Sequence, residues 1–362
     1  MRDVAPLLQG DSVSITTLMR QSQHWKNSVL GILCFSANED ESVMIATGTE
    51  IPCINVPMQR LDAVDSISEI WHGSGDLKQG RHDAVYYRHS DDVLFGVIKL
   101  SEKAYLANSS KTSLQQATES AYQQIFSLIK TLHYPYIYRF WNYIADINRQ
   151  DNLNNLDNKR LDRYGQFNLG RKDAFLAHGR DVTGDVPAAC ALGFTQGPLT
   201  IAFLAGRVAA ISIENPRQIS AYNYPKQYGP RSPTFARASL VRLGQHEVLF
   251  ISGTASIVGH ATLHPADVAV QTQETMTNIE AVLAEANRVT HQPKLCLVDL
   301  NYRVYVRHAA DWAKVQAEII RYIGSTPPKA MYLQADVCRQ DLLLEIEATA
   351  EYSLTPLSAT QD

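Results

Sequence analysis

Apolar positions along the chain repeat with two periods, and the order in which these periods alternate predicts the architecture. A continuous apolar run at 93–100 indicates a buried strand, and apolar residues then recur every three or four positions over 114–131, which predicts an amphipathic helix. The inward stripe of this helix is Leu114, Ala117, Ala121, Ile125 and Leu128. A further strand-like run at 137–144 completes a strand, helix, strand order.

The same order returns in the second half of the chain. Residues 248–252 predict a strand, 270–286 a helix, 295–306 another strand and 311–323 a second helix. The apolar stripes of these two helices are Met276, Ile279, Leu283 and Ala286, and Trp312, Val315, Ile319 and Ile323. Recurrence of one ordered pattern predicts an internal duplication.

Two further segments locate the boundary between the repeated units. The Asn- and Asp-rich run 146–162 has the composition of a surface excursion, so we expect it to interrupt the first unit. The apolar stretch 186–213, which glycines punctuate, predicts strands that open the second unit. The expected boundary is near residue 180, which gives an N-terminal domain at 1–180 and a C-terminal domain at 181–362.

Composition excludes several classes of protein. The 362 residues suffice for about two domains, and 45% hydrophobic with 19% charged residues is typical of a globular protein. A net charge of −4 argues against nucleic-acid binding. No signal peptide is apparent, and no run of about 18 uncharged apolar residues predicts a membrane span. The five scattered cysteines predict reduced thiols and a cytoplasmic protein; they are Cys34, Cys53, Cys190, Cys296 and Cys338.

The segment 215–237 has the composition of an anion-binding loop. It contains four basic residues, three tyrosines and four prolines, and no acidic residue lies between Glu214 and Glu247. Arginine binds carboxylates in a bidentate manner, tyrosine adds a hydroxyl and a flat ring, and proline reduces the entropy lost on ordering. The basic and aromatic side chains are Arg217, Lys226, Arg231, Arg237, Tyr222, Tyr224 and Tyr228. We infer a small, ring-bearing carboxylic acid as the ligand.

Longer motifs resemble two related families. The segment 330–350, which contains Glu-Ile-Glu-Ala, resembles the final strands of the Rid family, also called the YjgF family, whose small trimers bind carboxylates in clefts between subunits. The wider pattern resembles the chorismatases, which split pyruvate from chorismate. The motifs that support this resemblance lie at 139–144, 214–218, 224–225, 228–233, 235–238 and 252–260. They span about 90–352, whereas residues 1–90 match less clearly.

The resemblance implies an α+β fold of two fused Rid/YjgF-like (chorismate mutase-like) units, each a mixed β-sheet packed by helices on one face. It also implies an active site mainly in the second unit, chorismate as the small-molecule substrate, and neither a metal nor an organic cofactor. The sequence has no Walker loop, GxGxxG or metal-ligand spacing. We expect a monomer or weak homo-oligomer with no nucleic-acid or membrane partner.

The resemblance places the catalytic acid at Glu345. Cleavage of the enolpyruvyl ether requires a proton on its methylene carbon, and a carboxylic acid whose pKa is raised by burial on a strand can deliver that proton. Glu345 lies within such an apolar run. Alternation along the strand puts Glu347 on the same face, so Glu347 is the second candidate, with a supporting hydrogen-bonding role as its main expectation.

Product choice is expected to depend on Gly253 and Cys338. In chorismatases this pair resembles the members that form 3-hydroxybenzoate, whereas alanines at both positions resemble those that hydrolyse chorismate to a dihydroxycyclohexadiene acid. The chain therefore resembles a 3-hydroxybenzoate former. Elimination to 4-hydroxybenzoate stays open.

The remaining candidates bind substrate or are structural. We expect Arg231 and Arg237, followed by Arg217, to bind the two carboxylates, and Tyr222 and Tyr228 to orient the ring. His260 and His264, which flank the turn after Gly259, are expected to be structural. Trp141, within the strand-like run of the first unit, is expected to lie in the core.

A non-catalytic Rid-like small-molecule binder and a Rid-like imine hydrolase are the alternative functions, because one fold hosts many activities. Rid-like deaminases place an arginine where this chain has Met331 and Tyr332. That difference argues against imine hydrolysis.

Overall fold

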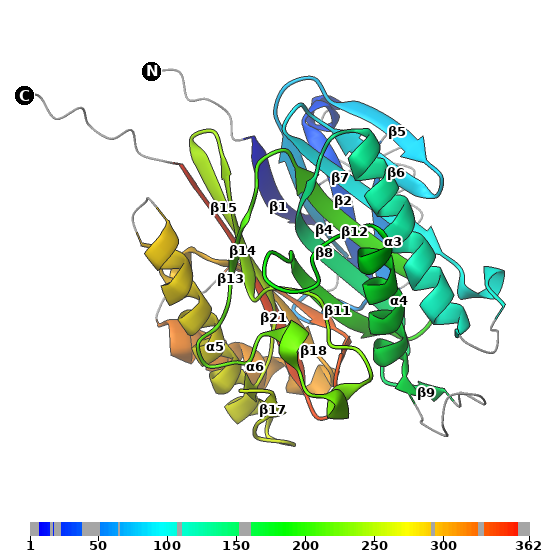
Figure 1. Cartoon of the computed structure of the whole chain (residues 1–362). Helices are drawn as coiled ribbons and strands as arrows, with labels where there is room; N and C mark the ends of the chain where they lie inside the picture. The colour runs from blue at the N-terminus through cyan, green and yellow to red at the C-terminus, as the bar shows by residue number, and fades with distance from the viewer. Residues whose placement is uncertain are drawn as a thin grey trace, which may run out of the picture.

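The computed structural model describes residues 7–14, 17, 23–37, 51–63, 66–106, 111–151, 161–290, 294–324 and 329–353. In Figure 1, helices α3 and α4 lie on one side of the molecule and α5 and α6 on the other, with the sheets between them. Each helix pair therefore covers one outer face of the sheets.

A seven-stranded mixed sheet with the order β20-β11-β8-β12-β7-β6-β5 forms the first unit. Its strands are β5 (Lys78–His82), β6 (Val85–His89), β7 (Val93–Leu100), β8 (Tyr136–Ala145), β11 (Ala188–Phe194), β12 (Leu199–Gly206) and β20 (Asp336–Val337). Helices α3 (Ser113–Thr131) and α4 (Arg163–Ala177) pack on it. The predicted elements at 93–100, 114–131 and 137–144 are confirmed.

Side-chain caps fix where these two helices begin. The Thr112 hydroxyl accepts a hydrogen bond from the Gln115 amide at 3.1 Å, and the Asp162 carboxylate accepts one from the Gly165 amide at 2.7 Å. Such caps satisfy first-turn N–H groups that have no partner within the helix. The predicted apolar stripe of α3 is buried throughout. Helix α4 is absent from the sequence prediction, because its apolar face is interrupted by polar residues.

A six-stranded sheet with the order β13-β14-β15-β21-β18-β19 forms the second unit. Its strands are β13 (Ile211–Ile213), β14 (Ala238–Leu243), β15 (His246–Thr254), β18 (Asn301–Val306), β19 (Lys329–Gln334) and β21 (Leu344–Ser353). Helices α5 (Val268–Val289) and α6 (Trp312–Ile323) cover it. The strand expected at 295–306 begins only at Asn301, because Leu297–Asp299 form a 3₁₀ turn closed by a Cys296 N–H to Asp299 bond of 2.7 Å.

The two units share one connectivity. The order β5-β6-β7-β12-β8-β11 of the first corresponds to β13-β14-β15-β21-β18-β19 of the second. Each contains one parallel pair, β8 with β11 and β18 with β19, and a helix links the two strands of each pair. The predicted duplication and the α+β class are confirmed.

The expectation that 186–213 opens the second unit is wrong for most of that stretch. Strands β11 and β12 pair with β8 and β7 in the first sheet, and only β13 joins the second. The physical reason is that an apolar run identifies a buried strand without identifying its partner. The excursion expected at 146–162 contains the short strands β9 (Gln150–Asp151) and β10 (Leu161–Asp162), and its middle lies outside the described residues.

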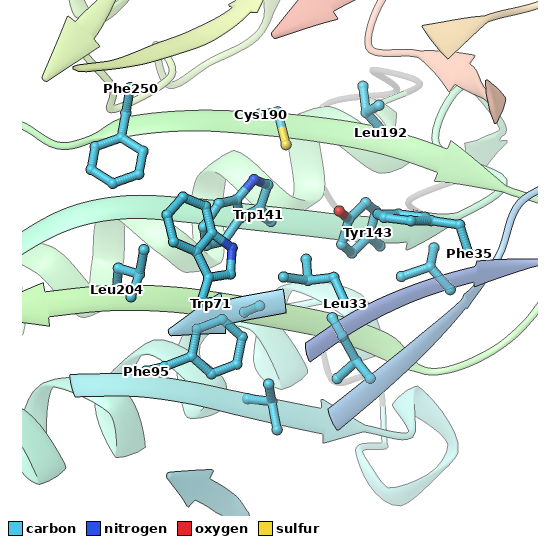
Figure 2. Packing of buried hydrophobic residues seen from close by; sticks show 14 of the residues in the cluster. Leu33, Phe35, Trp71, Phe95, Trp141, Tyr143, Cys190, Leu192, Leu204 and Phe250 are labelled. Carbon is cyan, nitrogen blue, oxygen red and sulfur yellow. The ribbon is translucent and has the colours of Figure 1, made fainter. Parts of the chain in front are cut away.

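The N-terminal extension contributes a third sheet. Its order is β1-β4-β2-β3, with β2 and β3 parallel, which matches β15-β21-β18-β19 of the second unit. The strands are β1 (Leu8–Ser14), β2 (Val29–Ser36), β3 (Cys53–Pro57) and β4 (Ile67–Gly73). The three sheets enclose one apolar core (Figure 2), in which Trp71 packs against Trp141 and Phe250 with ring centroids 5.7 and 5.6 Å apart. The expected core position of Trp141 is confirmed.

The first and second units meet along β11. The Ala188 and Ala189 amides donate to the hydroxyls of Ser239 and Ser252, each at 2.9 Å. Strand β20 leaves the second unit and pairs with β11 through Leu192 and Val337. This junction places the ends of β15 and β21 beside the first sheet. None of the helices in the described part of the chain is long and apolar enough to span a membrane.

Candidate active site

A cavity of about 1060 Å³ lies at the junction of the two units. Its walls come from β11, α4, β15, β21, the loop before β14 and the turn after β20. The polar and ionisable residues that line it include Gln115, Asn148, Asp162, Tyr164, Arg171, Cys190, Tyr224, Lys226, Tyr228, Arg237, Cys338, Arg339 and Glu345. Since both units contribute, the site is not confined to the second unit.

Glu345, the second residue of β21, reaches this cavity while its side chain stays buried, with 4% of the residue exposed. Burial raises the pKa of Glu345 to about 8, and the positive charge of Arg139 acts in the opposite direction. The carboxyl is therefore protonated at neutral pH. A protonated carboxylic acid that faces a cavity can act as a general acid.

Gly253 on β15 provides the space that the Glu345 carboxyl occupies. A methyl group at position 253 would overlap the Oε1 atom of Glu345, and it would also lie 3.2 Å from Cβ of Cys190. The missing side chain is therefore a geometric requirement of the present Glu345 position.

Cys338 forms an apolar wall beside the acid. It packs against Ala255, Ile257, Val337 and Leu342. Burial raises its pKa to about 12, and the nearby Glu345 acts in the same direction. Since a neutral thiol is a poor nucleophile, this environment favours a shaping role for Cys338 over covalent catalysis.

Three arginines line the cavity with a buried nitrogen that has no hydrogen-bond partner among the described residues. These atoms are Nε of Arg171, Nε of Arg237 and Nη2 of Arg339. The Nη2 atom of Arg171 donates to Asn168 Oδ1 at 2.8 Å, and the Nη2 atom of Arg237 donates to the Tyr224 hydroxyl at 2.8 Å. Because buried donors are normally satisfied, the three side chains are suited to an anionic ligand.

Aromatic rings form another wall of the site. The guanidinium of Arg339 lies over the Tyr228 ring, 3.9 Å from its centroid, and 5.1 Å from the centroid of Tyr224. The Arg339 side chain also donates to the His260 carbonyl at 2.9 Å. Tyr228 contacts Nδ1 of His260 at 3.2 Å through its hydroxyl. Tyr228 therefore lies in the cavity wall, where the sequence predicted a site residue. His260 lies next to it and contacts its hydroxyl.

Three residues predicted to bind substrate lie outside the cavity lining. Arg217 is ion-paired with Glu274 and hydrogen-bonded to Asn278, both at 2.6 Å, so it ties the loop to α5. Arg231 is exposed, and Tyr222 is half-buried away from the lining. The structure therefore does not bring these three residues to the cavity wall, where the ligand was expected to contact them. Composition marked the loop as cationic, but the direction of each side chain depends on partners distant in sequence.

Glu347 lies in a different environment from Glu345. Its carboxylate pairs with Arg139 and with Arg303, the latter at 2.7 Å, and accepts a hydrogen bond from the Tyr305 hydroxyl at 2.7 Å. Two guanidinium partners stabilise the ionised form, and Glu347 is not part of the cavity lining. The arrangement favours the supporting role expected for it over that of the acid.

Sequence reasoning missed Arg171 and Arg339. Arg171 lies on α4, a helix that the sequence pattern did not predict. The direction of its side chain towards the cavity could therefore not be predicted either. Arg339 directly follows Cys338, and an arginine next to a candidate site residue is the only signal that could have identified it. No group of three or more His, Cys, Asp or Glu side chains within the described ranges could hold a metal ion.

Replacing Glu345 with glutamine should change stability in a pH-dependent way. The folded pKa of about 8 exceeds the ordinary value of 4.5, so between these pH values the folded state retains a proton that the unfolded state has lost. Stability therefore falls as pH rises through this window. Glu345→Gln removes that loss, and we expect it to stabilise the fold by on the order of 3 kcal/mol at pH 8. Thermal unfolding measures this gain in stability. If the variant were more stable than the parent protein by the same amount at pH 5 and at pH 8, the raised pKa of Glu345 would be contradicted.

The sequence matches two known protein-family models and related curated proteins. Residues 69–205 match the family model described as chorismatase FkbO/Hyg5-like, N-terminal, and residues 235–352 match the model described as endoribonuclease L-PSP. A chorismatase of Streptomyces rapamycinicus is 37% identical over 289 residues, which cover 78% of this chain and 82% of that protein. A 3-hydroxybenzoate synthase of Streptomyces hygroscopicus is 35% identical over 291 residues, with 78% and 81% covered.

A solved structure agrees over nearly the whole chain. The crystal structure of a chorismatase at 1.08 Å resolution superposes with a TM-score of 0.80 at 29% identity, and covers 95% of this chain and 98% of that one. The superposed length includes the N-terminal sheet region that sequence motifs matched poorly.

Proposed function

The chain belongs to the chorismatase family, whose Rid-like units it shares and whose chorismate-cleaving activity it has, and on this premise we propose that it converts chorismate into 3-hydroxybenzoate and pyruvate. One observation supports this most: the cavity combines a buried, protonated carboxylic acid with three arginines that have unpartnered donors. Chorismate requires both, because it has an acid-labile enol ether and two carboxylates.

Arg171, Arg237 and Arg339 are the proposed ligands of the two carboxylates. Charge-assisted hydrogen bonds to carboxylates are about twice as strong as neutral ones, and an anion would satisfy donors that are otherwise buried without a partner. Arg237 is the one member of this set that the sequence predicted. Tyr228, stacked against Arg339, would form the apolar surface for the ring.

Glu345 is the proposed proton donor. Transfer of its proton to the methylene carbon converts the enol ether into an oxocarbenium ion, and cleavage of the ring carbon–oxygen bond then releases pyruvate. When the neighbouring 4-hydroxyl displaces that oxygen, an epoxide forms and opens to 3-hydroxybenzoate with loss of a proton, which returns to Glu345. No water is consumed, and the atoms of chorismate equal those of the two products.

Exclusion of water decides between this route and hydrolysis. Attack by a hydroxyl within the substrate avoids the entropy cost of bringing in a second reactant, which is worth several kcal/mol. The apolar wall that contains Cys338 offers a water molecule beside Glu345 few hydrogen-bonding partners. Gly253 and Cys338 therefore support 3-hydroxybenzoate over the dihydroxycyclohexadiene acid, and 4-hydroxybenzoate remains a second candidate product.

The test is incubation of the purified protein with chorismate, followed by enzymatic measurement of pyruvate and chromatographic separation of the aromatic products. We expect equal amounts of pyruvate and hydroxybenzoate, with the 3-isomer dominant. A protein that binds chorismate but releases no pyruvate above the uncatalysed rate would be a binder, and the proposal would be wrong.

Removing a carboxylate ligand should weaken substrate binding more than turnover. We expect Arg171→Met and Arg237→Met each to raise KM about tenfold or more, because each removes a buried charge-assisted contact. Arg231→Met is the matched control, since this exposed arginine of the same loop lies outside the lining. Steady-state kinetics of pyruvate release provide the comparison. If Arg231→Met raised KM as much as Arg237→Met does, the assignment of Arg237 as a carboxylate ligand would be refuted.

A further inference from the structure

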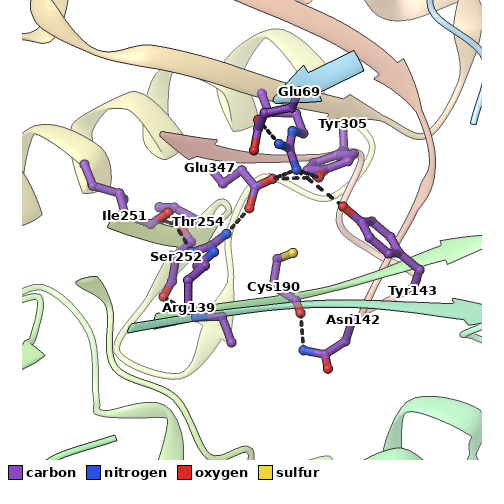
Figure 3. A network of polar contacts seen from close by, with 12 residues as sticks. Glu69, Arg139, Asn142, Tyr143, Cys190, Ile251, Ser252, Thr254, Tyr305 and Glu347 are labelled. Carbon is purple, nitrogen blue, oxygen red and sulfur yellow. Dashed lines mark hydrogen bonds and ion pairs between the residues drawn. The ribbon is translucent and has the colours of Figure 1, made fainter. Parts of the chain in front are cut away.

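A chain of buried charges connects the surroundings of Glu345 with the N-terminal sheet. Arg139 on β8 pairs with Glu347 on β21, Glu347 pairs with Arg303 on β18, and Arg303 pairs with Glu69 on β4. Figure 3 shows Glu347 at the centre of this network, with Arg139 on one side and Glu69 and Tyr305 on the other. The chain thus joins strands from all three sheets.

The chain is electrically balanced. It contains two arginines and two glutamates, and Arg139, Arg303 and Glu347 are each at most 4% exposed. The Trp71 indole donates to Glu69 at 2.8 Å, and the Arg139 guanidinium donates to the Ile251 carbonyl at 3.0 Å. Because charges interact strongly where water is excluded, removal of any one member leaves a net charge near Glu345.

The positive charge of Arg139 lowers the pKa of Glu345, against the effect of burial. Other ionisable groups that face Glu345 come from α4, β11, β18, the turn after β20 and β21 itself: Tyr164, Cys190, Tyr305, Cys338 and Glu347. Four charged residues also line the cavity that contains Glu345: Asp162, Arg171, Arg237 and Arg339. Burial raises the pKa of the two tyrosines and two cysteines far above neutral. Arg139 and its partners therefore set the part of the local charge that comes from outside the substrate cavity.

We propose that Glu347, Arg303 and Glu69 are positioning residues that neutralise Arg139 and thereby keep Glu345 in its acid form. The proposal rests on the function assigned to Glu345 above. It gives the N-terminal sheet a role in the reaction, since Glu69 supplies the terminal countercharge although no described residue of that sheet lines the substrate cavity.

Geometry separates this electrical role from a direct one. Arg139, Arg303, Glu347 and Glu69 line a different cavity, of about 410 Å³, and none of them lines the cavity that contains Glu345. Neutral substitutions among them change the charge near Glu345 without changing the walls of the substrate site. Their place in this separate cavity favours an indirect role.

The test is a titration of the Glu345 carboxyl by ¹³C NMR of protein labelled at the glutamate side-chain carboxyl, with the signal assigned by its loss in Glu345→Gln. Because this measurement needs no turnover, it remains informative if chorismate is not the substrate. We expect Glu347→Gln, which leaves Arg139 unneutralised, to lower the titration midpoint by about one pH unit or more. Glu69→Gln, one pair further away and partly exposed, should lower it by about half a unit.

Tyr305→Phe is the matched control, since it removes a hydrogen bond to Glu347 without changing any charge; we expect its midpoint to stay that of the parent protein. The alkaline limb of the kcat profile should move to lower pH in the two glutamine variants by the same amounts. If Glu347→Gln does not fold, the titration midpoint of Glu345 in Glu69→Gln alone tests the proposal. An unmoved or raised midpoint in the folded glutamine variants would overturn the proposal, as would an equal shift in Tyr305→Phe.

Discussion

Glu345→Gln is expected to lower kcat for pyruvate release by about 10³-fold. Glutamine keeps the size and shape of the side chain but cannot donate a proton to the methylene carbon. Substrate binding should persist, because the three arginines of the cavity are unchanged. Pyruvate release under saturating chorismate measures the loss, and circular dichroism checks the fold.

Glu351→Gln is the matched control for this substitution. Glu351 lies on the same strand, and burial raises the pKa of Glu351 to about 7. Its carboxyl accepts a hydrogen bond from the Gly10 amide at 2.6 Å and lies outside the substrate cavity. We expect activity within about twofold of the parent protein. If Glu345→Gln retained activity, another group of the cavity would have to be the acid.

Gly253→Ala combined with Cys338→Ala should redirect the reaction from 3-hydroxybenzoate towards the hydrolysis product. The methyl group at 253 would displace the Glu345 carboxyl, with which it overlaps, and the smaller side chain at 338 would leave space for water. We expect the dihydroxycyclohexadiene acid to become the main aromatic-pathway product, at a lower total rate. Chromatography of the products measures the ratio.

Cys296→Ala serves as the control for loss of a thiol, since Cys296 is exposed and outside the cavity; its product ratio should equal that of the parent protein. An unaltered ratio in the double variant would show that these two positions do not control access of water.

The elements with a strong period were predictable from sequence, and so was part of the site. Periodicity located α3, α5 and α6 to within three residues at each end. The family resemblance identified Glu345, Gly253 and Cys338, and the composition of the loop 215–237 identified Arg237 and Tyr228; all five line one cavity. The catalytic, binding and product-determining roles of these residues remain proposals.

What sequence could not give depends on pairing between distant segments. The partners of β11 and β12 are set by hydrogen-bond ladders to β8 and β7, which leave no trace in a local apolar pattern. Arg217 and Arg237 look alike in one loop, yet Glu274, 57 residues away, draws only Arg217 out of the site. The third sheet was hidden for a similar reason, because its four strands repeat the order of the second unit without a shared sequence motif.

The central claim, that chorismate is cleaved by displacement within the substrate, is tested most directly by turnover in H₂¹⁸O. Mass spectrometry of the aromatic product and enzymatic measurement of pyruvate report the outcome. The account predicts equal amounts of pyruvate and 3-hydroxybenzoate, with no ¹⁸O at the phenolic oxygen. Solvent ¹⁸O in the ring product, or no pyruvate above the uncatalysed rate, would contradict it.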